Sequence, residues 1–238
     1  LHLNNHPYYP LMVLDQGYWP EGLMTAPSDE AFKLDIEMMK TMGFNGCRKH
    51  QKVEDPRFMY WADKLGFLVW GEMAAASIYT DKAAIRLQNE WSEIIRRDYN
   101  HPSIVTWVPF NESWGVPSVK SDPAQQAHTL SLYYQTRSLD QTRPVISNDG
   151  WVLTKTDICG IHTYAHGNPD LPQDEKKVQF FKDMLQDPQQ LLSDYHAARP
   201  VFADGFDYEG QPIMLTEVGG IAFQNEGAGS WGYTQATD

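Results

Sequence analysis

The sequence predicts an α/β fold, a (β/α)8 TIM barrel that is C-terminally incomplete and has about seven strands. Short apolar runs alternate with helix-like segments, and such alternation gives a parallel sheet. Runs such as 104–108 are continuously apolar, which is typical of strands buried on both faces. The chain has 238 residues, close to the usual size of this barrel. No internal boundary is visible, so we expect residues 1–238 to form a single domain.

The N-terminal part supplies a hairpin, a first strand and a first helix. Asn4-Asn5 predicts a turn inside a short hairpin at 1–10, and 11–14 follows as the first strand. Ser28 is expected to cap the helix by accepting a backbone N–H of its first turn, and Gly43 to end it. The spacing predicts that its apolar stripe consists of Leu34, Met38, Met39 and Met42.

The same strand–helix unit then recurs to the end of the chain. Further strands are predicted at 44–48, 67–70, 103–108, 144–147, 157–161 and 212–216. Helices are predicted at 56–65, 81–99, 123–139 and 174–195, the last one broken near Pro188. No eighth strand is evident, and 219–238 reads as a long loop. A doubly wound open sheet is the rival fold, but its glycine-rich first turn does not match Asp15-Gln16-Gly17-Tyr18.

Charge and composition exclude several classes of partner. The net charge of −12 argues against a nucleic-acid backbone or an anionic membrane, because neither is attracted to an acidic surface. No run of 18 apolar residues and no signal peptide are visible, so we expect a soluble protein. The chain starts at Leu1 without an initiator Met, and we expect a piece of a longer chain. Cys47 and Cys159 are expected to be buried free thiols.

Polar residues follow the predicted strands at their C-terminal ends. In a barrel these ends all lie on one face, where the active site is built. An acid at one such position is often a helix cap or an ion-pair partner, but capping alone does not explain so many positions in register. The set is Asp15, Arg48, His50, Glu72, Asn111, Glu112, Asn148, Asp149, Trp151, His162, Tyr164 and Glu217. Glu112 and Glu217 each close an apolar run, and paired carboxylates are the machinery of glycoside hydrolysis.

Two segments of the chain resemble glycoside hydrolase family 2, which includes β-galactosidases, β-glucuronidases and β-mannosidases. The segment 100–113, Asn-His-Pro-Ser-Ile-Val-Thr-Trp-Val-Pro-Phe-Asn-Glu-Ser, is similar to the acid/base signature of that family. Thr216-Glu217-Val218-Gly219-Gly220 is similar to its nucleophile strand. Residues 46–50 and 68–72 lie where the second and third strands of the family should be. The resemblance runs from about Leu11 to Trp231 and implies a (β/α)8 catalytic domain accompanied by other domains of a longer parent chain.

The resemblance implies roles for the residues that match. Glu112 would be the general acid and then the general base, and Glu217 the nucleophile of a retaining mechanism. Asn111 would hydrogen-bond the 2-hydroxyl of the sugar, with a turn residue as the alternative interpretation. Tyr164 would hydrogen-bond the nucleophile, with a tyrosine at the edge of the core as the alternative. The other interpretation of Glu112 is a solvated loop acid, which the apolar run before it disfavours.

Further residues are weaker candidates for binding the carbohydrate. His162 and Asp15 could bind sugar hydroxyls, and Arg48 and His50 could form the floor of the site, with a buried Arg48–Glu72 ion pair as the alternative. Aromatic residues on the loop side could stack on sugar rings or simply pack, and these are Trp114, Trp151 and Trp231.

The leading functional hypothesis is a retaining hydrolase of terminal β-linked sugars. A β-galactosidase-like activity is favoured, because the Asn-x-Lys carboxylate clamp of the glucuronidase members is not found after Glu217. The second hypothesis is an inactive or carbohydrate-binding barrel fragment. A metal-dependent hydrolase using His50, His162 and Glu217 ranks last because no ligand motif supports it. We therefore expect no cofactor and no metal.

Overall fold

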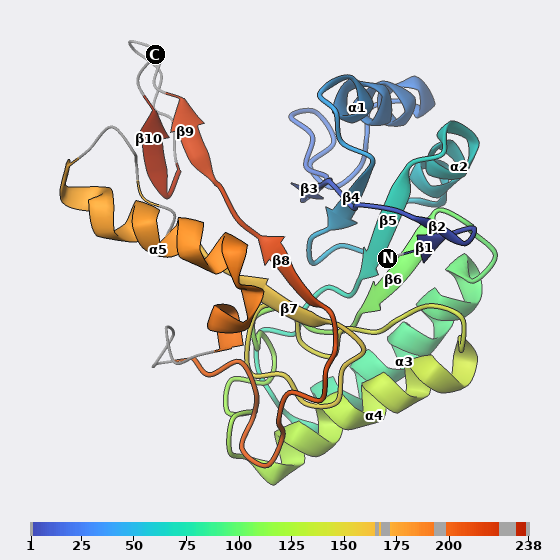
Figure 1. Cartoon of the computed structure of the whole chain (residues 1–238). Coiled ribbons are helices and arrows are strands. Elements are labelled where there is room, and N and C mark those ends of the chain that lie inside the picture. Colours follow the sequence, from blue (N-terminus) through green and yellow to red (C-terminus); the bar gives the residue numbers. More distant parts are fainter. Residues whose placement is uncertain (1, 165–166, 168–171, 193–198, 224–231, 237–238) are drawn as a thin grey trace.

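Parallel strands with helices on their outer side make up most of the structure, a computed structural model (Figure 1). It describes residues 2–164, 167, 172–192, 199–223 and 232–236. Four parallel strands are adjacent in chain order: β3 (Met12–Asp15), β4 (Gly46–Lys49), β5 (Leu68–Glu72) and β6 (Ile104–Val108). A second parallel pair consists of β7 (Cys159–His162) and β8 (Ile213–Glu217).

Single parallel bridges join the four-stranded sheet to the second pair. Trp107 bridges to Val145, Asn111 to Asp149, and Gly150 to Ile161. The stretch at 144–150 therefore occupies the position of a strand between β6 and β7. The prediction of a partial barrel with about seven strands is confirmed. The predicted strand at 144–147 is wrong in detail, because only isolated bridges and no continuous ladder form there.

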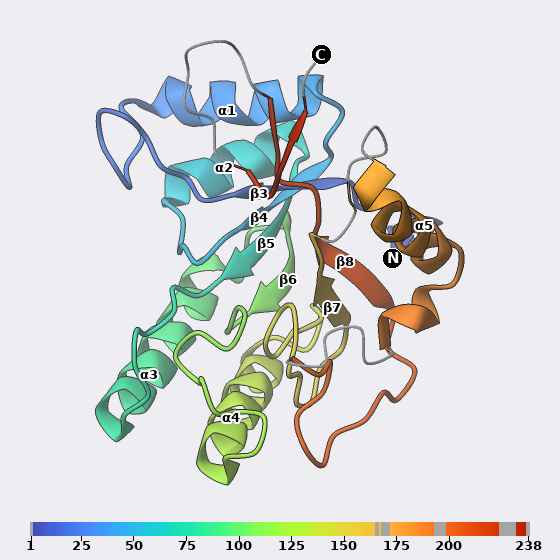
Figure 2. The ribbon, with the colours of Figure 1, turned by 90° about the vertical axis from the view of Figure 1, so that its left-hand side faces the viewer.

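Five α-helices alternate with the strands among the described residues. They are α1 (Asp29–Thr41), α2 (Pro56–Leu65), α3 (Asp81–Asp98), α4 (Pro123–Leu139) and α5 (Glu175–Gln186), and the 3₁₀ turns are η1 (Pro172–Asp174) and η2 (Pro188–Leu192). Ser28 caps α1 as predicted, since its side chain accepts the N–H of Ala31. The predicted break near Pro188 is confirmed by the change from α5 to η2. Figures 1 and 2 show α1 beside α2 and α3 beside α4.

The buried face of α1 differs from the predicted one. Phe32, Ile36 and Met39 are buried, whereas Leu34, Met38 and Met42 are more than half exposed. Only Met39 of the predicted stripe is therefore correct. Two apolar stripes with helical spacing run along this helix, and the one with the aromatic ring packs inward.

The two ends of the chain form short strand pairs. The predicted N-terminal hairpin is confirmed by the antiparallel pair β1 (His2–Leu3) and β2 (His6–Pro7). The long loop predicted at 219–238 is wrong in part, because β9 (Ile221–Phe223) pairs in parallel with β10 (Thr234–Ala236). Trp231 lies outside the described residues.

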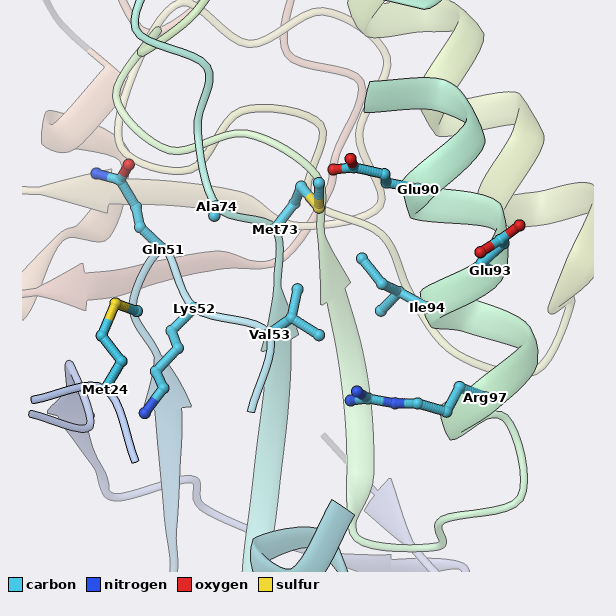
Figure 3. A pocket seen from close by; sticks show the side chains of 10 residues that line it. All are labelled: Met24, Gln51, Lys52, Val53, Met73, Ala74, Glu90, Glu93, Ile94 and Arg97. Atoms are coloured by element: carbon cyan, nitrogen blue, oxygen red, sulfur yellow. The ribbon is translucent and has the colours of Figure 1, made fainter. Parts of the chain in front are cut away.

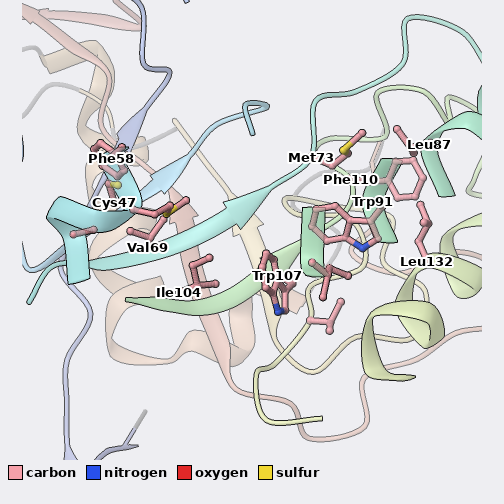
Figure 4. Packing of buried hydrophobic residues seen from close by; sticks show 14 of the residues in the cluster. Cys47, Phe58, Val69, Met73, Leu87, Trp91, Ile104, Trp107, Phe110 and Leu132 are labelled. Carbon is pink, nitrogen blue, oxygen red and sulfur yellow. The ribbon is translucent and has the colours of Figure 1, made fainter. Parts of the chain in front are cut away.

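The core lies between the sheet and its helices (Figure 4). Trp91 of α3 packs edge-on against Trp107 of β6, with ring centroids 5.7 Å apart. The indole N–H of Trp91 donates to Thr136, and that of Trp107 donates to Asp140. Both buried rings therefore have partners for their polar atoms, which avoids the cost of an unpaired buried donor.

Cys47 and Cys159 are free and buried, as predicted. Within the part of the chain that the structure describes, β3 pairs only with β4 and β8 only with β7, so the sheet has two free edges. No helix among those residues is long and apolar enough to cross a bilayer.

Candidate active site

The C-terminal strand ends surround a cavity of about 340 Å³. Several residues singled out from the sequence meet in its wall, together with Tyr233 from the C-terminal segment. They are His50, Asn111, Glu112, Trp114, Tyr164 and Glu217. The strands deliver these side chains to one face, as the barrel arrangement predicts.

The two carboxylates predicted to form a pair lie close together. One carboxylate oxygen of Glu112 and one of Glu217 are within 4.8 Å of each other. The side chain of Glu112 is 22% exposed and that of Glu217 is 6% exposed, so Glu112 is the more accessible acid. This spacing suits retaining glycoside hydrolysis, which needs carboxyl groups about 5–5.5 Å apart, and is too short for the inverting arrangement.

Arg48 of β4 connects three carboxylates below the cavity. Its guanidinium bonds Glu217 and Asp149, and its Nε lies 3.4 Å from Glu72. Burial alone lowers the pKa of Arg48, but Glu72, Asp149 and Glu217 raise it above its usual range. The guanidinium therefore remains charged. The expected position under the site and the alternative ion pair with Glu72 both occur in the structure.

Tyr164 holds the other oxygen of Glu217. Its hydroxyl donates to Glu217 Oε2 at 2.5 Å. Burial, followed by this hydrogen bond, raises the pKa of Tyr164 above its usual range, so the phenol stays protonated as a donor. The ring of Tyr164 stacks on Tyr233, with centroids 3.7 Å apart.

The backbone at the end of β6 is held in an unusual conformation. Glu112 and Ser113 have φ angles of 52° and 62°, in the left-handed region that costs energy for residues other than glycine. The side chain of Asn148 accepts the Ser113 N–H at 2.8 Å and donates to the Ser113 hydroxyl at 3.0 Å. The N–H of Glu112 donates to the carbonyl of Asp149. These bonds fix the direction in which the Glu112 side chain points.

Asn111 has one half of its amide free for a ligand. Its Oδ1 accepts from Arg48 at 3.4 Å, whereas its buried Nδ2 has no protein partner. A buried donor without a partner is costly, so such a group at the wall of a cavity is suited to bind a ligand oxygen.

The comparison with known families agrees with this geometry. The family described as "Glycosyl hydrolases family 2, TIM barrel domain" matches residues 26–230. The chain belongs to glycosyl hydrolase family 2. The resemblance seen in the sequence is thereby confirmed.

Known members of glycosyl hydrolase family 2 include similar proteins with different named activities. Human β-glucuronidase is 24% identical, over 77% of this chain and 29% of its own length. A β-galactosidase of Bacteroides ovatus is 25% identical, over 63% of this chain and 22% of its own length. The chain thus spans less than a third of either relative.

A solved structure of the family shows the same fold. It is Bacteroides uniformis β-glucuronidase 2, covalently bound to cyclophellitol-6-carboxylate aziridine. It superposes with a TM-score of 0.60 at 26% identity, over 79% of this chain and 24% of the other.

Four of the described residues proposed from the sequence to bind carbohydrate do not line the cavity: Arg48, His162, Asp15 and Trp151. Arg48 and His162 are buried and contact Glu217 and Glu112, respectively. The carboxylate of Asp15 pairs with Lys49 at 2.5 Å and accepts the Gly17 N–H. Trp151 packs its ring against His162, and Arg199 lies over its face. Trp231 lies outside the described residues.

Asn148 and Asp149 follow a predicted strand, but the sequence alone does not assign a role to either residue. Asp149 is fully buried and contacts Arg48, His162 and Thr216. Burial raises the pKa of Asp149, but the charges of Arg48 and His162 outweigh burial and hold it well below its usual range. The only sequence signal for both residues was their position after the run at 144–147.

A larger hollow of about 590 Å³ lies beside α3 (Figure 3). Methionine and aliphatic side chains line it together with charged groups, of which Arg97 donates to Asp98 and to the Glu54 carbonyl. Neither Glu112 nor Glu217 lines this hollow. The two carboxylates therefore face the smaller cavity and not this hollow.

One group could offer ligands to a metal. Atoms of Glu112, His162 and Glu217 lie within 4.8 Å of one another, and this is the one such group found in the described part of the chain. Arg48 already bonds Glu217, and His162 carries a proton at neutral pH because the charge of Asp149 and the hydrogen bonds to Asp149 and Glu112 raise its pKa to about 9. A metal ion would have to displace both positive groups, so the arrangement suits hydrogen bonding better than metal binding.

Proposed function

We propose that this chain is the catalytic barrel of a retaining β-glycosidase that releases terminal β-linked neutral sugars, with β-galactosides as the first substrates to test. The observation that carries the proposal is the pair Glu112 and Glu217, with carboxylate oxygens within 4.8 Å. Glu217 is the nucleophile, because Arg48 and Tyr164 occupy its oxygens with donors. Glu112 is the acid and then the base, because its side chain is more exposed to the leaving group and to water.

Other residues of the cavity receive supporting roles. The free Nδ2 of Asn111 is suited to the 2-hydroxyl of the sugar, whose hydrogen bond strengthens in the transition state. Trp114, which is 55% exposed at the cavity, is suited to stack on a sugar ring. His50, also in the wall, is suited to a hydroxyl. Burial, followed by the Arg48 charge, lowers the pKa of His50, so its imidazole is neutral at pH 7.

The preference for a neutral sugar rests on the charges around the cavity. No Lys or Arg lines it among the described residues, and Arg48 behind it is 3% exposed and already paired. A sugar carboxylate would meet Glu112 and Glu217 without a free cation. Relatives carry both β-glucuronidase and β-galactosidase names, so charge is the discriminating criterion. The greater length of these relatives also supports the proposal that other domains accompany the barrel.

The alternative is a barrel that binds carbohydrate without hydrolysing it. The free edges of β3 and β8 favour this alternative, because an open barrel holds the two carboxylates less firmly. A panel of 4-nitrophenyl β-glycosides, including galactoside, glucoside, mannoside and glucuronide, separates the two. Turnover of the galactoside and not the glucuronide is expected. Binding without turnover of any member supports the alternative.

Azide distinguishes the nucleophile from the acid/base residue, whichever β-glycoside the protein cleaves. Glu217→Gly with azide is expected to give the α-glycosyl azide, because one displacement replaces two. Glu112→Ala with azide is expected to give the β-glycosyl azide, because azide takes the place of water in the second displacement. The opposite products would reverse the assignment.

A further inference from the structure

His162 lies between the proton donor and the nucleophile of the proposed site. The ladder between β7 and β8 shifts register between Ile161 and His162, and after this bulge His162 is opposite Glu217. Its Nδ1 is 2.8 Å from Glu112 Oε1 and 3.5 Å from Glu217 Oε1. Without the shift, the imidazole would not point at both carboxylates.

The imidazole of His162 is enclosed by protein. Its side chain is 1% exposed. A Cβ on Gly150, where φ is +107°, would lie 2.6 Å from Nδ1, so only glycine leaves room for the ring. Trp151 packs edge-on, with ring centroids 5.7 Å apart. A ring so enclosed contacts a sugar hydroxyl poorly and is suited to hold another side chain in place.

Asp149 fixes the far side of the ring. Oδ2 of Asp149 is 3.3 Å from His162 Nε2, and Oδ1 accepts the Thr216 hydroxyl at 2.7 Å. Arg48 bonds the same carboxylate and lies 3.2 Å from Nε2. The side chain of Asp149 therefore cannot rotate away from the imidazole without losing two other bonds.

The charges facing His162 favour its protonated form. The carboxyl groups of Asp149, Glu112 and Glu217 face it, against the positive charge of Arg48 and the imidazole of His50. Burial alone lowers the pKa of His162, but the charge of Asp149 and the hydrogen bonds to Asp149 and Glu112 outweigh it and raise the pKa to about 9. At neutral pH both ring nitrogens are therefore donors.

We propose, on the basis of the function proposed above, that His162 is a positioning residue for the proton donor: its Nδ1–H, oriented by Asp149, fixes Oε1 of Glu112 and leaves Oε2 to protonate the leaving group. In the first step the Oε2 proton moves to the glycosidic oxygen as its bond to C1 breaks and a Glu217 oxygen bonds C1. In the second step a water oxygen bonds C1, its proton returns to Oε2, and the bond to Glu217 breaks. The proton of His162 stays on Nδ1 throughout.

Two substitutions of His162 distinguish a role in positioning Glu112 from a role in supporting the whole site. The amide nitrogen of Asn occupies nearly the place of Nδ1, so His162→Asn keeps the donor to Glu112. The amide of Gln reaches the place of Nε2, so His162→Gln loses that donor. His101, which pairs with Asp63 before β6 and away from the cavity, provides the control His101→Gln.

The measurement compares two leaving groups in the whole encoded protein. A 2,4-dinitrophenyl β-glycoside needs little protonation, whereas a methyl β-glycoside of the same sugar needs a general acid. For the methyl glycoside, His162→Gln is expected to reduce kcat/KM about 100-fold, the low end of general acid catalysis, and His162→Asn less than about 10-fold. For the dinitrophenyl glycoside, both variants and His101→Gln should stay within a few-fold of the wild type.

Other outcomes overturn the proposal. Equal losses of His162→Gln on both substrates would mean that His162 supports the whole site, and no loss on either would remove its role. If His162→Gln does not fold, Asp149→Asn takes its place and must show the same dependence on the leaving group. Failure of the wild type to cleave even the dinitrophenyl glycoside would overturn the proposed function, and this proposal with it. If the wild type cleaves both glycosides but His162→Gln lowers kcat/KM equally for both, only the proposal for His162 is overturned.

Discussion

Glu72 makes the stability of the barrel depend on pH between about 5 and 8. Its side chain is fully buried at the end of β5, beside Arg48, and accepts the Gln51 N–H at 2.7 Å. Burial, opposed by the Arg48 charge, raises the pKa of Glu72 from 4.5 to about 7. Because the folded carboxyl holds its proton more tightly than the unfolded one, its contribution to stability is complete below pH 4.5 and is lost as the pH rises through 7.

The size of this effect follows from the two pKa values. A rise from 4.5 to about 7, at about 1.36 kcal/mol per pH unit, is worth about 3.4 kcal/mol, and about 2.5 kcal/mol of it falls between pH 5 and pH 8. Glu72→Gln keeps the shape and the acceptor for Gln51 but cannot ionise. The free energy of unfolding of the wild type should therefore fall by about 2.5 kcal/mol more than that of the variant over this range.

Urea unfolding of both proteins at pH 5 and pH 8 measures this double difference. Titrating groups that do not contact Glu72 contribute equally to both proteins and cancel. Glu90→Gln, a substitution of an exposed glutamate of α3, is the control and should show the wild-type pH dependence. A double difference below about 0.5 kcal/mol would refute the reasoning, since Glu72 would then be as easily ionised in the fold as in the unfolded chain.

Three further substitutions test separate parts of the structure. Tyr164→Phe removes the donor to Glu217 but keeps the ring on Tyr233; aryl-glycoside kcat/KM should fall about 10- to 100-fold at an unchanged melting temperature, and unchanged activity would contradict the contact. Asn148→Ala leaves the Ser113 N–H unpaired and should lower the free energy of unfolding by about 1–3 kcal/mol in urea, a change near zero being the contrary result. Leu132→Ala, at a fully buried position, should cost about 2–5 kcal/mol in the same assay, clearly more than the matched change at half-buried Leu130.

The order of strands and helices could be predicted because strands such as β6 are continuous apolar runs and most helices carry local boundary signals. The buried face of α1 could not be predicted from the sequence. Leu34, Met38 and Met42 follow helical spacing as well as Phe32, Ile36 and Met39 do, and only the position of the sheet decides between the two faces. The irregular strand at 144–147 has a similar cause, because a ladder depends on the register of both neighbours.

The pairing of Glu112 with Glu217 could be predicted because Glu112 follows β6 and Glu217 ends β8, and parallel strands bring their C-terminal ends to one face. The placement of His162 between the carboxylates was beyond the sequence. It depends on a register shift within the β7–β8 ladder and on a glycine at position 150, neither of which leaves a pattern along the chain. The support that Asn148 gives to Ser113 is likewise a contact between residues 35 apart in sequence.

Arg48 links the stability of the barrel to the geometry of Glu217, the proposed nucleophile. One guanidinium contacts Glu72, Asp149 and Glu217, so removing the charge of Glu72 strengthens the attraction of Arg48 to the other two carboxylates. Removing one partner from a buried ion network usually costs stability, yet burial opposes the ionisation of Glu72 and raises its pKa to about 7. Measured against the wild type, Glu72→Gln should therefore be relatively more stable at pH 8 than at pH 5, while Arg48 binds Glu217 more tightly. A carboxylate held more tightly by a cation is a weaker nucleophile, so the same variant should form the glycosyl-enzyme more slowly.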